Sequence, residues 1–283
     1  MFFSKKLNNC IFCNSSQKFL VKTNTISDFN PTIFETKISK KIKSRTNGIC
    51  LNCGLFQNFY RFDEDELKVF NSVNKDRLTS SKDFSEYPPN KSFLDSFHNT
   101  YFEKRLRKWN VFFKKNKIKP QKVLIIRYWF GNIVDFLKKQ NANEVFGVEM
   151  SDNCRKYVNE QKIQITDIEC ETNGLIGKDI EKYGKFDAIF CFHILSHSID
   201  VKKNLELLKS ILKNQGFIIF SNEIERKPHN PFHNIHFSEY QLLMVLSDFF
   251  SKIDRIDDCQ SEFLPYVNPF TKKNDVPDFV VWK

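Results

Sequence analysis

The amino-acid sequence predicts a doubly wound α/β domain preceded by a small zinc-ribbon-like module. From Pro120 onward, short apolar runs alternate with segments of helical length, which is the pattern of a buried parallel sheet with crossover helices. Ahead of that region stand two Cys-x-x-Cys pairs, a spacing that is typical of zinc sites. A chain of 283 residues has room for one full-sized α/β domain and a smaller module.

The four N-terminal cysteines predict a structural zinc site in a module spanning residues 1–60. Two residues between cysteines let both thiolates of a tight turn reach one tetrahedral ion. Two such turns fill the coordination shell, so no position is left for catalysis. The segment between the pairs is longer than in most zinc ribbons and carries a compact basic run, KISKKIKSR. The predicted ligands are Cys10, Cys13, Cys50 and Cys53; the alternative is two incidental pairs of reduced thiols.

Residues 61–119 predict a helical linker region. Asp63–Phe70 has acidic residues first and apolar residues later, as the start of a helix does. A polar stretch with a Pro-Pro pair then predicts a loop over residues 71–91. Between Ser92 and Lys117, aromatic and apolar residues recur at helical spacing, and this predicts a packed helix.

Seven strands are predicted in the third region, residues 120–283. The apolar runs are KVLIIRYWFG, VFGVEMS, KIQIT, FDAIFCFHIL, GFIIFSNE, FFSKIDRID and DFVVWK. Val201–Leu212 has the amphipathic period of a crossover helix that a Gly-containing turn ends. In such a sheet the ligand lies at the carboxyl ends of the strands. The isolated cysteines Cys154, Cys170, Cys191 and Cys259 are predicted to be small core residues.

Composition limits the partners. The hydrophobic fraction is 41% and the charged fraction 28%, as in ordinary globular proteins. The net charge of +10 is spread along the chain among acidic residues, so nucleic acid is an unlikely partner on charge alone. No segment approaches the roughly 20 apolar residues of a membrane-spanning helix. Lys5 and Lys6 stand where a signal peptide would be apolar, and a cytoplasmic protein is expected.

The stretch Val123–Glu223 resembles the class I S-adenosylmethionine-dependent methyltransferases. VLIIRYWFG, FGVEMS, FDAIFCFHILSH and GFIIFSNE stand in the family's order of glycine-rich turn, acid-ended strand, fourth strand and fifth strand. CIFC and CLNCG resemble a cysteine module found ahead of a subset of these enzymes, many of which methylate sugars or other small metabolites. The resemblance implies a Rossmann-like seven-stranded fold, S-adenosylmethionine as cofactor and a small-molecule acceptor.

The resemblance also assigns cofactor-binding residues. Glu149 ends the second strand, where an acid accepts hydrogen bonds from the ribose hydroxyls; a merely exposed strand-end acid is the alternative. Met150 beside it would pack on the adenine, and Asp167, after the third strand, would accept from the adenine amino group. Phe192, at the end of the fourth strand, completes the set together with Arg127 and Gly131 of the first turn.

The first turn departs from the family pattern, which is close to VLDIGCGTG. Only the last glycine, Gly131, is kept. Trp129 stands at the second glycine position, where the backbone must approach the cofactor closely, and Arg127 stands at the first. Two accounts remain open. Either the turn is rebuilt, with Arg127 pairing an anionic group of cofactor or substrate, or the pocket is filled and the domain is catalytically silent.

Histidines are the candidate general bases, because imidazole titrates near neutral pH. His193 and His197 frame the turn after the fourth strand, where Ser196 replaces the family's glutamate. The segment HNPFHNIHFSEY adds His229 to the pair His233 and His236, and resembles the family's segment before a late helix. The candidate catalytic residues are therefore His193, His197, His233 and His236.

Three functions follow, in order of preference. The first is methyl transfer from S-adenosylmethionine to a small molecule, for which the resemblance suggests a sugar or nucleotide-linked sugar. The second is a catalytically silent methyltransferase fold that serves as a binding or assembly subunit, as Trp129 and the missing glycines indicate. The third is an RNA methyltransferase guided by the cysteine module and its basic run. The sequence does not determine the methylated atom or the oligomeric state.

Overall fold

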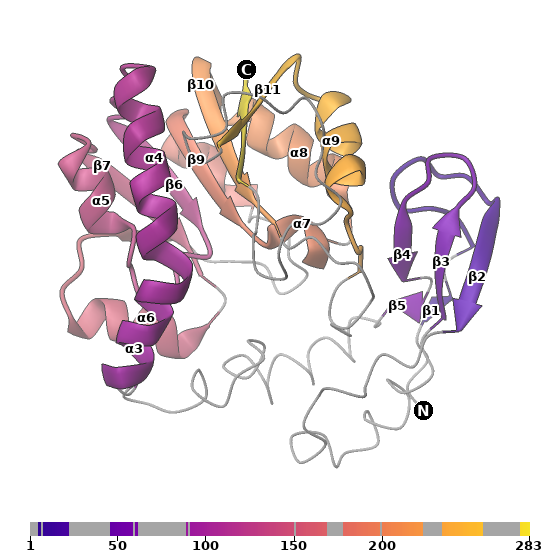
Figure 1. The fold of residues 1–283 in the computed structure, drawn as a ribbon, viewed down its shortest axis with the longest axis horizontal. Helices are drawn as coiled ribbons and strands as arrows, with labels where there is room; N and C mark the ends of the chain where they lie inside the picture. The colour runs from indigo at the N-terminus through magenta and orange to yellow at the C-terminus, as the bar shows by residue number, and fades with distance from the viewer. Residues whose placement is uncertain are drawn as a thin grey trace.

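The computed structural model describes residues 5–6, 8–22, 46–58, 60–61, 89, 91–149, 151–168, 178–198, 200–222, 234–256 and 278–283. It consists of an α/β domain and a small β-module next to it (Figure 1). Among the described residues, none of the helices combines the length and the apolar character that crossing a bilayer requires.

Seven of the described strands form one sheet, in the order β11-β12-β10-β9-β6-β7-β8. All neighbours pair in parallel except at β12, which is antiparallel to both β10 and β11. The sheet confirms the predicted doubly wound fold. Its strands are β6 (Lys122–Ile126), β7 (Glu144–Val148), β8 (Thr166–Ile168), β9 (Phe186–Phe192), β10 (Leu212–Ser221), β11 (Lys252–Ile256) and β12 (Asp278–Trp282).

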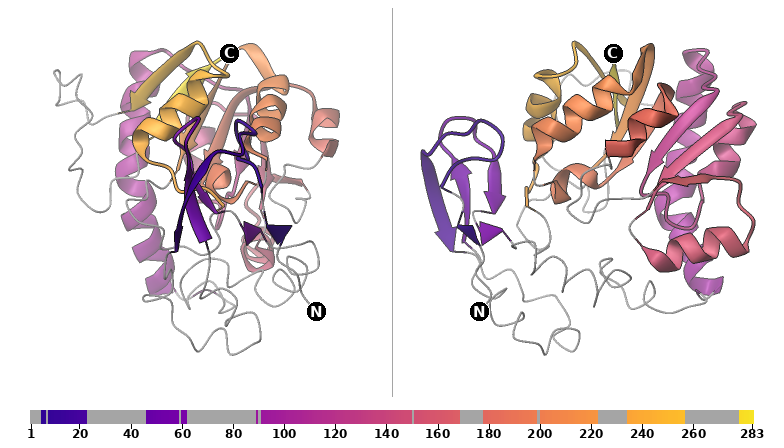
Figure 2. Two further views of the ribbon diagram at one scale, coloured as in Figure 1. Left: turned by 90° about the vertical axis from the view of Figure 1, so that its right-hand side faces the viewer. Right: turned by 180° about the vertical axis from the view of Figure 1, so that it is seen from behind.

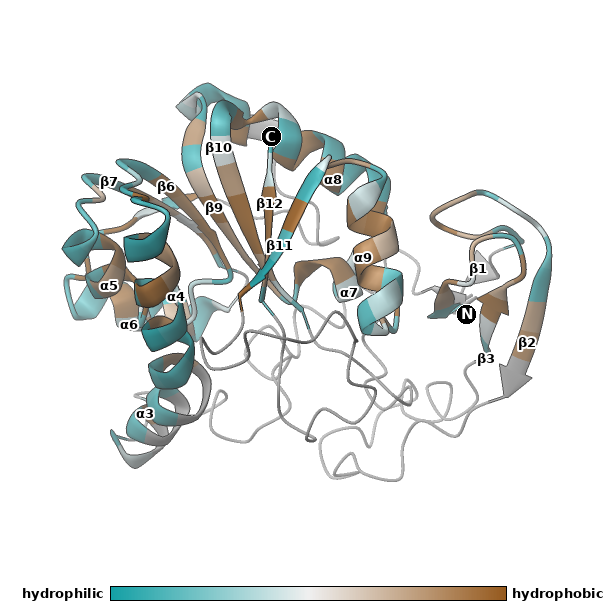
Figure 3. Cartoon of the chain, turned by 45° about the horizontal axis from the view of Figure 1, so that its top comes forward, coloured by the Kyte–Doolittle hydropathy of each residue, from teal (hydrophilic) through white to brown (hydrophobic). Residues whose placement is uncertain are grey.

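Helices cover both faces of the sheet (Figure 2). Alternate side chains of β6 point to opposite faces, and Val123 and Ile125 pack in a different core cluster from Leu124 and Ile126. Hydrophobic colour runs along β9 and β10 between the helices (Figure 3). The helices are α3 (Lys91–Phe97), α4 (Lys104–Lys115), α5 (Val134–Lys139), α6 (Asp152–Glu160), α7 (Ile194–His197), α8 (Val201–Ser210) and α9 (Glu239–Ser247).

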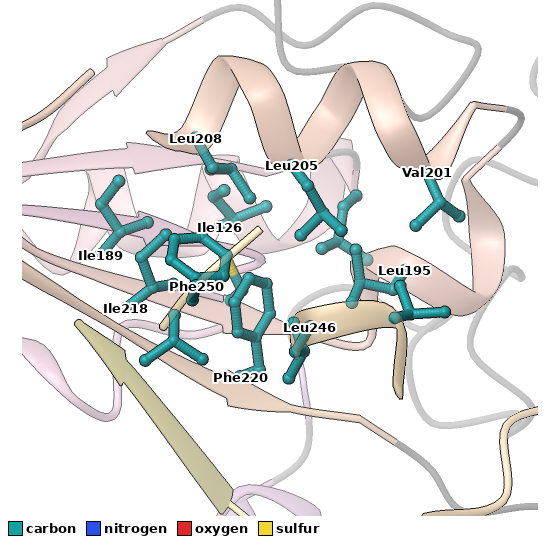
Figure 4. Packing of buried hydrophobic residues seen from close by; sticks show 14 of the residues in the cluster. Ile126, Ile189, Leu195, Val201, Leu205, Leu208, Ile218, Phe220, Leu246 and Phe250 are labelled. Atoms are coloured by element: carbon teal, nitrogen blue, oxygen red, sulfur yellow. The ribbon is translucent and has the colours of Figure 1, made fainter. Parts of the chain in front are cut away.

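The core on the α8 side follows directly from the amphipathic pattern of that helix. Leu205 and Leu208 point from α8 onto Ile126, Ile189 and Ile218 of the sheet (Figure 4), and all five side chains are at most 1% exposed. Burying aliphatic side chains of this size stabilises the fold by roughly 1.5–3 kcal/mol each. The strands appear in the sequence as uninterrupted apolar runs because both faces of the sheet are covered by helices.

The N-terminal module is an antiparallel sheet of β2 (Lys18–Lys22), β3 (Thr46–Cys50) and β4 (Phe56–Asn58), beside the short pair β1 (Lys5–Lys6) and β5 (Tyr60–Arg61). It joins the α/β domain through the segment before α9. Gln57 forms an antiparallel bridge with Ile235, and the backbone N–H of His236 donates to the Phe56 carbonyl at 3.0 Å.

Several element boundaries differ from the sequence expectation. The helix expected over 92–117 is divided into α3, a π-helix (His98–Glu103) and α4. The expected crossover helix ends at Ser210, and Leu212 already begins β10 because it pairs with Phe186. The third strand lies at Thr166–Ile168 rather than KIQIT. The expected helix start at 63–70 and the basic run at 37–45 lie outside the described residues, as does most of the expected loop at 71–91.

Candidate functional site

The four N-terminal cysteines come together at one point. Their Sγ atoms all lie within 4.8 Å of one another. The Cys10 and Cys53 sulfurs are 3.6 Å apart, and those of Cys13 and Cys50 are 3.4 Å apart. A tetrahedral zinc with Zn–S bonds of about 2.3 Å requires sulfurs about 3.8 Å apart. The cluster is therefore compatible with the expected structural zinc and has no open ligand position.

The two thiols of the first Cys-x-x-Cys pair have different environments. Burial raises the pKa of Cys10 to about 11. Cys13 is less buried, and hydrogen bonds from the Asn52 side chain and the Ser15 backbone outweigh its desolvation, so its pKa falls to about 7. Because a zinc ligand must be a thiolate, protons compete with the metal at this site.

The turn after β6 keeps a glycine-type backbone although it has lost two glycines. The φ angles are 64° at Arg127, 48° at Trp129 and 76° at Gly131, all in the left-handed region that glycine adopts most easily. Hydrogen bonds hold this path: the Arg127 N–H donates to the Val148 carbonyl at 2.7 Å. Each non-glycine residue in this conformation costs about 1–3 kcal/mol, which the surrounding structure must offset.

Glu149, at the end of β7, is 3% exposed. Its Oε2 accepts the backbone N–H of Trp129 at 2.8 Å, and its Oε1 accepts the backbone N–H of Ser151 at 3.0 Å. The carboxylate thus bonds the turn after β6 to the start of α6. The alternative of a merely exposed strand-end acid is wrong.

Tyr128 connects the turn to β8. Its hydroxyl donates to Asp167 Oδ1 at 2.9 Å. Its ring lies on Gly147 of β7, where an added Cβ would be 2.3 Å from the ring. Burial raises the pKa of Asp167, while the Tyr128 hydrogen bond and the charge of Arg155 act in the opposite direction. Burial, followed by the nearby charge of Asp167, raises the pKa of Tyr128. Asp167 lies within β8 rather than after the third strand as expected.

Trp129 points toward the carboxyl end of β9. The residue is 8% exposed, and its ring centroid lies 4.8 Å from Phe192, 5.5 Å from Phe102 and 6.0 Å from His193. Phe102 belongs to the π-helix, so the indole joins the segment before the domain to the end of a central strand. This position is at the switch between β6 and β9, where a ligand of a doubly wound sheet binds.

The three described candidate histidines have different surroundings. His193 has a left-handed backbone (φ 53°), and its N–H donates to the Ser221 carbonyl at 2.8 Å. His197 ends α7. His236 is 2% exposed and packs on Phe56 with a centroid distance of 5.4 Å, so its ring contact is with the cysteine module. Met150, His229 and His233 lie outside the described residues.

A buried polar cluster at the same end of the sheet had no signal in the sequence. Asp278 Oδ2 accepts from Arg105 Nε at 3.1 Å and from Trp109 Nε1 at 2.9 Å. Asp278 pairs with Ser221 across β12 and β10. Asp278 Oδ1 and the Ser221 hydroxyl oxygen are buried and have no hydrogen-bond partner among the described residues. The cluster fastens α4 to the strand ends beside Phe192, whose ring lies 5.9 Å from the Arg105 guanidinium carbon.

An open cleft of about 590 Å³ lies elsewhere, at the amino ends of the strands. Asp187, at the start of β9, and Lys213, at the start of β10, line it and form an ion pair at 2.7 Å. In a doubly wound sheet the ligand end is the carboxyl end, so the turn after β6 is the better candidate for the functional site.

Comparisons with known proteins concern the family and the fold. Residues 130–220 match the family described as methyltransferase domain. The chain covers 78% of its own length and 100% of a structure of the plantazolicin methyltransferase BpumL in complex with a pentazolic desmethylPZN analog and SAH, at 13% identity and a TM-score of 0.50. An S-adenosylmethionine-dependent methyltransferase from Clostridium acetobutylicum matches at 14% identity over 68% of this chain and 97% of that chain, with a TM-score of 0.48. No curated protein sequence matches. Residues 130–220 are thus similar to a methyltransferase-domain family, and the chain has the fold of these S-adenosylmethionine-dependent enzymes.

Proposed function

We propose that this methyltransferase-domain protein transfers a methyl group from S-adenosylmethionine to a small-molecule acceptor. The observation that carries the proposal is the turn after β6, which keeps the backbone of a glycine-rich cofactor turn and is bonded to an acid at the end of β7. The matched family over residues 130–220 and the fold support the same reaction class.

The residues present match the chemistry of this cofactor. Glu149 would accept hydrogen bonds from the ribose hydroxyls and Asp167 from the adenine amino group, with the Gly131 turn beside them. Arg127, Met150 and Phe192 remain predicted contacts. When bound, the cofactor supplies an already activated methyl group, so the protein mainly has to orient the acceptor. In this structure the Trp129 indole packs on Phe192, and the Tyr128 hydroxyl donates a hydrogen bond to Asp167. Two of the predicted cofactor contacts therefore already have partners within the chain.

We assign the proton-accepting role to His193 first. It stands at the carboxyl end of β9 and contacts Trp129, whereas the ring contact of His236 is with Phe56 of the cysteine module. His197 and His233 remain predicted alternatives. The structures of BpumL contain pentazolic and triazolic desmethylPZN analogs, which is consistent with a small organic acceptor. The sugar or nucleotide-sugar acceptor rests on the resemblance of the cysteine module.

A second function is favoured by one specific observation. The indole at the second glycine position is packed on Phe192 and Phe102 rather than exposed to a pocket. If this packing is permanent, the domain is a catalytically silent methyltransferase fold that acts as a binding or assembly subunit.

Calorimetric titration of the zinc-loaded protein with S-adenosylmethionine and with SAH tests the proposal. Wild-type protein should bind both ligands, and Glu149→Ala should weaken binding by at least about tenfold, or 1.4 kcal/mol. Glu149→Gln keeps the shape of the side chain and separates loss of charge from collapse of the turn. Glu144→Ala is the matched control, because Glu144 is an exposed acid at the other end of β7 and should leave binding unchanged. Absence of binding to folded wild-type protein would favour the silent fold.

A further inference from the structure

The turn after β6 has the backbone conformation of a glycine-rich turn, but most of its side chains are aromatic. Trp129 has a φ of 48°, so a glycine at this position would follow the same path without strain. The Trp129 N–H already donates to Glu149 Oε2, which fixes the backbone independently of the indole. The side chain is therefore the only part of Trp129 that distinguishes this turn from an open one.

The indole lies at the carboxyl ends of β6 and β9, where a doubly wound sheet binds its ligand. It contacts three rings, from the end of β9, the residue after it and the π-helix: Phe192, His193 and Phe102. Trp129 as a whole is 8% exposed, so it is buried like a residue of the core. A ligand at the switch between β6 and β9 would need the same space.

Tyr128 likewise stands in for a part of the cofactor, at Asp167 of β8. Its hydroxyl donates to Asp167 at 2.9 Å, and so takes the role that the amino group of a bound adenine would have at this carboxylate. Its ring is held on Gly147, which has no side chain to displace it. Two neighbouring aromatic side chains thus occupy both ends of the proposed cofactor site.

We infer that Trp129 is an internal plug: its indole takes the place of the methionine portion of the cofactor, and S-adenosylmethionine or SAH binds only when the indole leaves Phe192. This inference rests on the proposed function, since it concerns access to the proposed cofactor site. Tyr128 competes in the same way for Asp167. Cofactor affinity is therefore set by the loss of aromatic packing as well as by the contacts that the ligand gains.

The first test compares SAH affinity in three proteins by calorimetry. Trp129→Gly should bind SAH at least tenfold more tightly than wild type, because it removes the plug and suits the left-handed backbone. Phe130→Leu is the matched control. Phe130 is the next aromatic residue of the same turn, but it packs on Tyr157 of α6, so its substitution should not tighten binding. Zinc content and circular dichroism establish that each variant is folded.

The second test follows the indole itself in the otherwise unaltered chain. The protein has three tryptophans, so labelling with 5-fluorotryptophan gives three fluorine resonances, and Trp129→Phe identifies one of them. Addition of SAH should move the Trp129 resonance toward the position of a solvent-exposed indole. Trp109 is held by Asp278 and Trp282 by Asp254, so their resonances should move less and serve as internal controls.

The outcomes separate the inference from the function on which it rests. Tighter binding to Trp129→Gly together with movement of the Trp129 resonance supports the plug. Binding to Trp129→Gly but not to wild type also supports it and makes the natural chain the silent fold. Equal binding to both proteins, with the Trp129 resonance unmoved, overturns the plug and leaves the proposed function standing. No binding to either folded protein overturns the proposed function, and the plug with it.

Discussion

The Tyr128 side chain changes the pKa of Asp167. Asp167 lies on β8, and burial raises the pKa of its carboxyl group. The Tyr128 hydroxyl partly reverses this, because a hydrogen bond to the ionised form favours that form. Tyr128, which a ligand at Asp167 would have to displace, is therefore also the residue that opposes the rise in the pKa of Asp167.

Tyr128→Phe should raise the pKa of Asp167 further. A carboxyl whose folded pKa lies above its unfolded value destabilises the native state above the folded pKa, and this penalty disappears as the pH falls toward the unfolded value of 3.8. The variant should therefore lose about 0.5–1.5 kcal/mol at neutral pH and less in mild acid. Urea unfolding at both pH values and carbon NMR titration of the carboxyl measure this. A pKa of Asp167 that falls in the variant would contradict the assignment of the hydrogen bond.

Helix α9 shows how local sequence and tertiary contacts act together in one element. Its N-terminus has a capping box: the Ser238 hydroxyl accepts the Gln241 N–H, and the Gln241 side chain accepts the Ser238 N–H. The Gln241 amide also donates to the Gly54 carbonyl of the cysteine module at 2.5 Å. The same residue thus caps the helix and joins it to the turn that follows Cys53.

Ser238→Ala should destabilise the protein by about 1 kcal/mol, because it leaves one backbone N–H of the first turn without its acceptor. Ser247→Ala is the matched control at the other end of α9. The Ser247 hydroxyl only donates to the Met244 carbonyl on an exposed surface, so its loss should cost much less. Thermal unfolding of both variants gives the comparison, and equal losses would argue against the cap.

At the scale of the molecule, the module with the four cysteines and the sheet of the α/β domain are linked by backbone hydrogen bonds. The Asn58 N–H donates to the Asn234 carbonyl at 2.9 Å, and the Asn234 N–H donates to the Ser196 carbonyl of α7 at 2.7 Å. Cys10, Cys50 and Leu55 belong to the same apolar cluster as the α8 side of the sheet. The N-terminal module therefore helps to hold α7, the helix that follows His193, in position.

Removal of the metal should loosen this link. Chelation should release about one zinc per chain and increase amide hydrogen exchange at Asn58 and His236, while the central strands β6 and β9 remain protected. Since the ligands must be thiolates, the metal affinity should fall as the pH falls. Mass spectrometry of exchange with and without chelator measures both regions. Unchanged protection at Asn58 would show that the module folds without metal.

The sequence was most informative where many residues contribute to one pattern. Apolar runs buried on both faces identified the strands, and spacing identified the four cysteines. It was silent where two distant residues make one contact: Arg105 and Asp278 lie far apart in the chain and meet only because α4 packs across β12. The left-handed backbone at Arg127 and Trp129 could not be predicted from local preferences either, because neither residue favours this conformation. The assignment of individual site residues remains a prediction.

The left-handed path of the turn after β6 determines which substitutions this turn can accept without a change of backbone. A turn that had refolded after losing its glycines could not recover by point substitution, because backbone and side chains would both have to change. Here the path is intact at Arg127, Trp129 and Gly131, so restoring a glycine requires no rearrangement of the main chain. Glycine at position 129 would therefore change the packing beside Phe192 and leave the main-chain path as it is, so this corner of the sheet can be varied without redesign of the fold.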